Sequence, residues 1–192
     1  MSVSDQVSFL LRISRSHDIV RRYFVVNGFD GALTMLGLII GFLVSTATDL
    51  TVIINACLGA AIALGMSGMS SAYVSESAER MHALSKLEEA MISDLHDSTH
   101  GDAARSVPIL IALVNGLAPF IISLLIIAPL LLAKAGVWLP VSPLYAAIAI
   151  ALVLIFFLGV FLGRIAGISW LRSGMQTLLM AVITCLLIYL FT

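Results

Sequence analysis

The sequence predicts an all-α, polytopic membrane protein with five transmembrane helices. Apolar residues make up 60% of the 192 residues and charged residues only 11%, and the mean hydropathy is +1.10. A typical soluble domain carries about 25% charged residues, which it needs to cover its surface. We therefore expect a multi-pass protein of the inner (plasma) membrane of the cell.

Five stretches are long and apolar enough to cross a hydrocarbon core, which takes about 20 helical residues. The expected spans are about 24–45, 51–74, 107–133, 143–163 and 170–191. They form one membrane domain, residues 23–192, which follows an amphipathic cytoplasmic segment at residues 1–22. This segment lacks the uninterrupted apolar core of a signal peptide and is expected to be retained.

The basic residues set the expected orientation. If the chain crosses five times, nine of the ten Lys and Arg residues fall on one side and only Lys134 falls on the other. Because short cytoplasmic loops carry the excess of basic residues, we expect the N-terminus in the cytoplasm and the C-terminus outside.

One sizeable polar element, residues 75–106, lies between the second and third spans. No proline interrupts residues 51–107, so the second helix is expected to extend into the cytoplasm and to end near Leu95. Asp102 is the expected cap of the helix that leads into the third span. The extension carries one expected apolar stripe, formed by Met81, Leu84, Leu87, Met91 and Leu95.

The first span contains a carboxylate, Asp30, seven residues into the apolar run from Tyr23 to Val44. Ionisable groups at such depth are costly and usually face a protein interior or a polar pathway. Polar and small residues share its helix face: Asn27, Asp30, Thr34, Gly37, Gly41 and Ser45. The GxxxG spacing within this face lets a second helix approach closely. We expect a polar pathway here; the alternative is a dry helix crossing in which Asp30 pairs with Asn27 or Thr34.

The second and third spans add polar residues to the expected pathway. One stripe of the second span carries Asn55, Gly59, Met66, Ser70 and Tyr73, with Met69 at its edge. A thioether suits a transition metal, although methionine is also a common core residue. In the third span, Asn115 and Pro119 indicate a kink, where freed carbonyls could coordinate cations or meet a neighbouring helix.

The cytoplasmic element carries candidate metal ligands. Glu76, Glu79 and His82 follow one another at three-residue spacing, and Glu-x-x-His is an element of four-helix di-iron sites. A solvated helix face is the alternative for these residues. Glu88 interrupts the apolar stripe, so we expect it to face a partner surface together with a cation or a hydrogen-bond donor. His96, four residues before His100, could join such a site if this segment is helical.

Two segments resemble the vacuolar iron transporter family. They are residues 27–41, in which Asp30-Gly is followed by an apolar stretch ending in Gly41, and residues 65–75, which end in Ala-Tyr-Val-Ser. The resemblance implies a homodimer that exports ferrous iron or manganese in exchange for protons, with Asp30 between the two first spans. The family's second-span methionine and glutamate positions hold Gly68 and Ala60 in this chain.

Together these features predict a divalent-metal transporter with no enzymatic activity and no permanently bound cofactor. Its expected partners are a second copy of the chain, the lipid bilayer, divalent cations and protons, with no nucleic acid. The expected pathway residues are Asn27, Asp30, Thr34, Asn55, Met66, Met69, Tyr73 and Asn115, and the expected metal ligands are Asp30, Glu76, Glu79, His82 and Glu88. The alternatives are a membrane-anchored metal-binding protein or ferroxidase that uses the cytoplasmic cluster, and a membrane protein without a transported ion.

Overall fold

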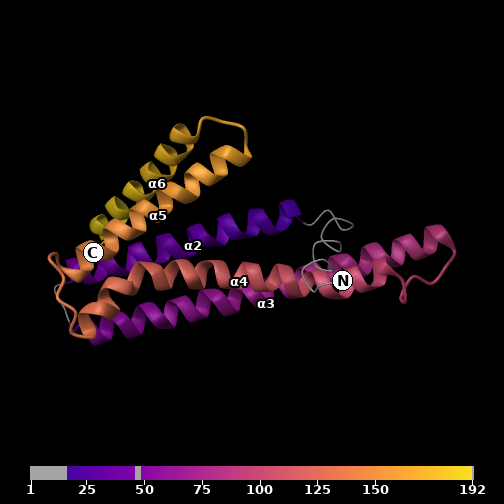
Figure 1. Cartoon of the computed structure of the whole chain (residues 1–192), viewed down its shortest axis with the longest axis horizontal. Helices are drawn as coiled ribbons and strands as arrows, with labels where there is room; N and C mark the ends of the chain where they lie inside the picture. Colours follow the sequence, from indigo (N-terminus) through magenta and orange to yellow (C-terminus); the bar gives the residue numbers. More distant parts are fainter. Residues whose placement is uncertain (1–16, 46–48, 192) are drawn as a thin grey trace. The chain divides into compact units, whose positions relative to one another are not determined.

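The computed structural model describes residues 17–45 and 49–191. The helices are α2 (His17–Val44), α3 (Leu50–Met91), α4 (Thr99–Lys134), α5 (Pro143–Ile165) and α6 (Trp170–Phe191), shown in Figure 1. In the described part of the chain these five helices are long and apolar enough to span a membrane, and no strand occurs. The predicted all-α class with five spanning helices is confirmed at this level.

The chain forms two compact units. The hairpin unit contains, in its described part, residues 17–24 and 65–117. The bundle unit contains residues 25–64 and the chain from residue 118 onward. The helices α2, α3 and α4 therefore each contribute residues to both units. The predicted segment 1–22 lies largely outside the described residues, and residues 17–22 belong to α2.

The core of the bundle unit is built from aliphatic residues at helical spacing. Fully buried members are Met35, Leu36 and Ile39 of α2, Ile53 and Cys57 of α3, Ile126, Ile127 and Leu130 of α4, Ala147, Ala151 and Ile155 of α5, and Ala181 of α6. These residues recur every three or four positions, so each helix presents one apolar stripe to the others. Because lipid is as apolar as leucine, the contact between helices depends on close packing.

Small residues permit that close packing between α5 and α6. A Cβ on Gly163 would lie 2.7 Å from the Cβ of Ser173, and a Cβ on Gly174 would lie 2.5 Å from Cε2 of Phe156. The single O–H of Thr177 is shared between two carbonyls, that of Gly174 in its own helix at 2.8 Å and that of Ile155 in α5 at 3.1 Å. This hydroxyl is thus satisfied inside the helical pair.

The hairpin unit has a smaller core between the long extensions of α3 and α4. It consists of Ala72, Ala103, Val107, Ile111 and Ala112, against which Val20, Tyr23 and Met69 pack. The two helices approach closely, since a Cβ on Gly116 would lie 2.5 Å from the carbonyl oxygen of Gly65. The first turns of α2 therefore pack on a pair of helices that crosses at glycines.

The structure corrects the predicted helix ends in this unit. Helix α3 does continue past the second span, but it ends at Met91 and not near Leu95. Ile92 has a φ of 51°, a left-handed conformation that ends a helix. The cap of α4 is Ser98 and not Asp102. Its hydroxyl accepts hydrogen bonds from the N–H groups of His100 at 3.2 Å and Gly101 at 3.4 Å, so α4 starts eight residues before the predicted span.

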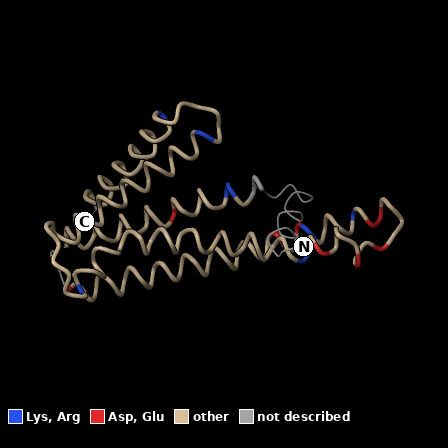
Figure 2. Tube along the Cα trace, in the orientation of Figure 1, with Lys and Arg blue, Asp and Glu red and all other residues tan. Residues whose placement is uncertain are grey.

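The predicted apolar stripe on the α3 extension divides between two environments. Leu84 is buried and Leu87 half-buried, and both line a small cavity together with Ala103 and Ala104 of α4. Met81 and Met91, by contrast, are exposed, and so are most of the charged side chains on this extension of α3. Figure 2 shows that acidic residues gather where α3 ends and α4 begins. The predicted stripe is therefore too broad: α4 covers the face of α3 that carries Leu84 and Leu87 and leaves Met81 and Met91 exposed.

The contact between Gly31 and Pro119 gives a test of the packing in the bundle unit. A Cβ on Gly31 would lie 2.7 Å from the carbonyl oxygen and 2.8 Å from the Cα of Pro119. Backbone cannot yield as a flexible side chain can, so we expect Gly31→Ala to lower the free energy of unfolding by about 1–3 kcal/mol. Thermal unfolding in detergent, followed by circular dichroism, measures this change.

Gly59→Ala is the matched control, because a Cβ at that position meets nothing within 4 Å. It should leave stability unchanged or raise it by up to about 1 kcal/mol through helix propensity. Equal stability of the two variants would contradict the packing described for Gly31.

Candidate functional site

Asp30 lies on the surface of the bundle unit. The opposite face of α2 is buried, with Ala32, Met35 and Leu36 inaccessible, whereas Asp30 is exposed. Asn27 and Thr34 on its own face are half-buried. Within the described residues, no hydrogen bond or ion pair engages the Asp30 carboxylate. The single protomer therefore does not show the dry pairing with Asn27 or Thr34 that was the alternative.

The same face of α2 continues as an open groove. Its volume is about 500 Å³, and it is lined by Thr34, Gly37, Leu38, Gly41, Phe42 and Ser45 together with Ile188 of α6. A Cβ on Gly41 would meet nothing within 4 Å, and one on Gly37 would lie 3.4 Å from Cδ1 of Ile188. Position 41 of the GxxxG sequence therefore faces open space, whereas position 37 is in contact with α6 through Ile188.

The polar stripe predicted on α3 is also exposed. Asn55 and Gly59 are exposed on the bundle unit, and Met66, Ser70 and Tyr73 are exposed on the hairpin unit. Each position is accessible in the protomer, as a pathway lining requires.

The two methionines at the stripe have different surroundings. Met66 is 57% exposed. Met69 is half-buried against the core of the hairpin unit, and its Cβ and Cε lie 2.9 and 3.1 Å from where Gly116 would carry a Cβ. Met69 therefore packs the α3–α4 crossing, and Met66 is the thioether left available for a ligand.

Asn115 connects α4 to α3 in the hairpin unit. It is buried, and its Nδ2 donates to the carbonyl oxygen of Gly68 at 2.6 Å. Because Pro119 has no N–H, the Asn115 carbonyl lacks its usual helical donor. That oxygen lies 3.0 Å from the position of a Cβ on Gly68. Of the two roles considered for the freed carbonyl, the structure shows contact with the neighbouring helix. A side chain at position 68 would therefore require the backbone at Asn115 to shift by a few tenths of an ångström.

The three expected ligands at residues 76–82 do not converge. Glu76 is buried, whereas Glu79 and His82 are exposed. The hydroxyl of Tyr23 donates to Oε1 of Glu76 at 3.3 Å, and Nε of Arg80 lies 3.7 Å from its Oε2. Glu76 is thus turned toward α2 and held there, and Glu79 and His82 alone face outward.

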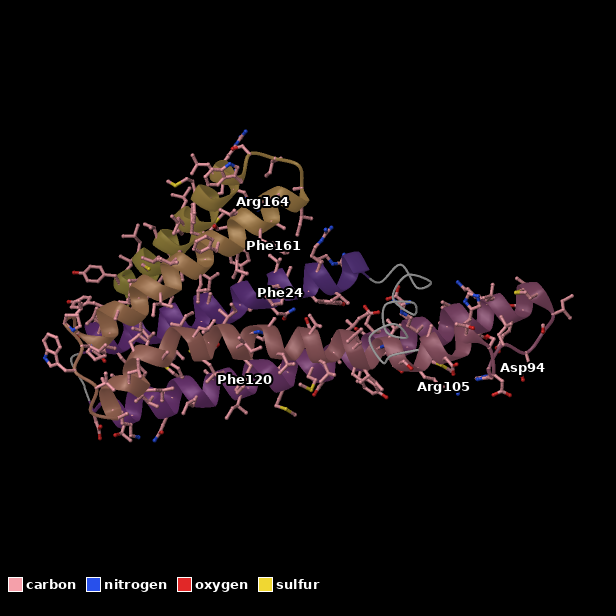
Figure 3. All side chains as sticks on the ribbon, viewed as in Figure 1. Phe24, Asp94, Arg105, Phe120, Phe161 and Arg164 are labelled. Atoms are coloured by element: carbon pink, nitrogen blue, oxygen red, sulfur yellow. The ribbon has the colours of Figure 1, made fainter. Side chains whose placement is uncertain are left out.

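Two residues that the sequence singled out, Glu88 and His96, come together with Asp94 at the turn between α3 and α4. Ligand atoms of Glu88, Asp94 and His96 lie within 4.8 Å of one another. Figure 3 labels Asp94 at this turn and Arg105 on α4. Asp94 had no expected role, and the grouping depends on the turn at residues 92–98, which periodicity does not reveal.

These side chains are engaged in stabilising the turn. Oε1 of Glu88 accepts from the N–H of Leu95 at 2.9 Å, and Oδ1 of Asp94 accepts from that of His96 at 2.8 Å. Nη2 of Arg105 lies 3.3 Å from Nδ1 of His96 and donates to its carbonyl at 3.2 Å. Glu88 therefore has a hydrogen-bond donor, as expected, but the donor belongs to its own turn and not to a partner surface. A guanidinium beside His96 opposes a second cation there.

The five long apolar helices define the chain as an integral membrane protein of the polytopic helical class. It belongs to the same family as "Uncharacterized protein MJ0645" of Methanocaldococcus jannaschii. The two are 30% identical over 172 residues, which cover 88% of this chain and 86% of that protein. No family model matches the chain, and no solved structure matches it.

The hydrogen bond from the Leu95 N–H to Glu88 can be tested by hydrogen exchange. Glu88→Ala removes the acceptor of the Leu95 N–H, so the amide of Leu95 should exchange with deuterium about tenfold faster, the equivalent of one hydrogen bond. Glu88→Gln keeps an acceptor oxygen and should retain most of the protection. Hydrogen exchange read by mass spectrometry over residues 92–98 measures both, with Glu89→Ala, at an exposed neighbour, as control. Unchanged exchange in Glu88→Ala would contradict the conclusion that Glu88 stabilises this turn.

Proposed function

We propose that the protein is a transporter that exports a divalent transition-metal ion, ferrous iron or manganese, from the cytoplasm as a homodimer. The observation that carries the proposal is Asp30, an exposed carboxylate without a described partner on a helix that is otherwise apolar. The resemblance of residues 27–41 to the vacuolar iron transporter family supports the same assignment.

Lipid is a poor environment for this carboxylate. Placing an aspartate at the centre of a spanning helix costs about 2.5–3.5 kcal/mol on insertion scales. A second copy of the chain, or water between two copies, removes this cost. A two-fold axis beside α2 would present Asp30 twice, and the open position at Gly41 leaves space for a close helix contact.

The paired carboxylates would suit ion exchange. Two facing carboxylates repel each other unless a cation or a proton lies between them. A divalent ion and protons would therefore occupy the same place alternately, which is the basis of an antiporter. Met66, the exposed thioether, would add a soft donor that favours a transition metal over calcium or magnesium.

The proposal also includes an orientation in the membrane and a role for the cytoplasmic residues. The N-terminus and the element 75–106 would lie in the cytoplasm, the C-terminus would lie outside, and the membrane would be the plasma membrane. Exposed Glu79 and His82 would attract ions to the cytoplasmic mouth. The metal is the substrate, and the protein would perform no catalysis and hold no resident cofactor.

Transport by wild-type protein and Asp30→Asn tests the proposal. In proteoliposomes, Asp30→Asn should lower the uptake of Fe²⁺ and Mn²⁺ at least tenfold, because the amide cannot neutralise the ion. Asp49→Asn is the matched control. Asp49 is exposed and its Oδ1 accepts from the N–H of Thr51 at 2.8 Å, a capping role that asparagine also performs. Flux that survives Asp30→Asn, or no flux in the wild type, would favour the metal-binding alternative.

Single cysteines test the orientation. Trp138, between α4 and α5, is 83% exposed, and Ile168, between α5 and α6, is 50% exposed. In a Cys57→Ala, Cys185→Ala background, a membrane-impermeant maleimide should label Trp138→Cys in intact cells. It should label Ile168→Cys only after the cells are permeabilised. The reverse pattern would invert the proposed orientation.

A further inference from the structure

The last part of the chain carries positive charge without negative charge. No acidic residue follows Asp102, so the ionised side chains of residues 103–192 are all basic. In the bundle unit these are Lys134, Arg164 and Arg172. Within the described residues no ion pair or side-chain hydrogen bond engages any of the three. The counter-charges for these residues therefore come from outside this segment.

Two of the basic residues lie at the same end of the α5–α6 pair. Arg164 is in the last turn of α5 and Arg172 in the first turn of α6, and both are exposed. They directly adjoin Gly163 and Ser173, where the helices touch, since a Cβ on Gly163 would lie 2.7 Å from that of Ser173. Figure 2 shows basic residues and no acidic residue at this end of the pair. The helix contact thus brings together two like charges without a carboxylate to neutralise them.

Hydrogen bonds fix the turn that joins the two helices. Gly167 has a φ of 68°, a left-handed conformation that glycine adopts without strain. The N–H of Ile168 donates to the carbonyl of Gly163 at 3.1 Å, and the N–H of Arg172 donates to the hydroxyl of Ser169 at 3.3 Å. The backbone that carries the arginines is therefore ordered before any ligand binds, which lowers the entropic cost of binding.

The side chains around the two arginines favour a lipid over a free anion. Ile168, Trp170 and Leu171 are all exposed at the turn. Tryptophan is typical of the membrane–water interface, and a guanidinium group binds phosphate oxygens through two parallel hydrogen bonds. A free phosphate ion gains nothing from apolar neighbours, whereas a phospholipid presents its phosphate beside acyl chains. The turn therefore matches both parts of an anionic phospholipid.

We propose that Arg164 and Arg172 together bind the phosphate of one anionic phospholipid at the α5–α6 turn. The lipid neutralises the two charges and anchors the last two spans to the leaflet that the turn faces. In the proposed orientation this is the cytoplasmic leaflet, whose surface is negative. The binding surface does not depend on the identity of the transported ion or on the existence of transport.

A role in topology alone would account for the same two charges. The excess of basic residues in cytoplasmic loops counts lysine and arginine alike. Shared binding of one phosphate instead requires the planar guanidinium group, which lysine lacks. The two roles therefore differ in their response to Arg→Lys substitutions.

Trp170 reports on lipid at the turn, and Trp138 is the other tryptophan of the chain. Protein with Trp138→Phe is reconstituted in phosphatidylcholine containing increasing fractions of phosphatidylglycerol brominated on its acyl chains, which quenches nearby tryptophan. Each basic residue near the surface contributes about fivefold, so two should give phosphatidylglycerol a preference of about tenfold or more at Trp170. In the Trp170→Phe control, Trp138, four residues after the single cation Lys134, should report about fivefold or less. Equal preferences at the two tryptophans overturn the proposal.

Lysine variants separate shared phosphate binding from charge. Arg164→Lys and Arg172→Lys keep the charge that determines topology, and each should lower the preference at Trp170 by about threefold or more. The double variant should lose little more than either single variant, because one phosphate is shared. Lys134→Arg, the reverse exchange at a single cation, should leave the preference at Trp170 unchanged. Full preference in both lysine variants, or a loss in the double variant equal to the product of the single losses, overturns the proposal.

Inorganic phosphate distinguishes a lipid headgroup from a free anion without any change to the arginines. Added to the Trp138→Phe protein, with chloride at equal ionic strength as the control, phosphate should leave most of the preference for phosphatidylglycerol intact. If phosphate abolishes the preference and chloride does not, the turn binds a free anion and the lipid assignment is overturned.

Discussion

The absence of water inside a bilayer is the constraint on which this structure depends. Every backbone N–H and carbonyl within the hydrocarbon must find a partner in the chain, so the spans are helices. Side chains then decide how the helices associate. Apolar residues cannot distinguish a neighbouring helix from lipid, and the close contacts accordingly occur at small residues such as Gly31, Gly116 and Gly163.

Polar side chains in these helices fall into two groups. Thr177 and Asn115 donate to carbonyls of a neighbouring helix, and so they hold helices together. Asp30, Asn55 and Tyr73 lie on exposed faces of the protomer. The first group accounts for stability within one chain. The second group makes no such contact in a protomer alone, and the proposed ion pathway between copies is based on these residues.

The helices within the membrane could be predicted because hydropathy and length suffice there. The fourth and fifth spans, expected at 143–163 and 170–191, agree closely with Pro143–Ile165 and Trp170–Phe191. The end of α3 and the start of α4 could not be predicted, because they depend on individual hydrogen bonds between side chains and backbone N–H groups. Ser98 caps α4, and Glu88 reaches seven residues ahead to the N–H of Leu95. Periodicity carries no information about either contact.

The candidate site was predicted in part, for the same reason. Helical spacing predicts a polar stripe on α3, and its members Met66, Ser70 and Tyr73 are all exposed on the hairpin unit. It could not show that Glu76 pairs with Tyr23, 53 residues earlier in the chain. Nor could it show that Met69 packs on Gly116 whereas Met66 is accessible. Contacts between distant residues need the fold.

The self-contained pairing of α5 and α6 has a consequence for biogenesis. The Thr177 hydroxyl and the glycines of this pair find their partners within the two helices. The last two spans can therefore leave the translocon together as a finished helical hairpin, without waiting for an earlier span to shield a polar group.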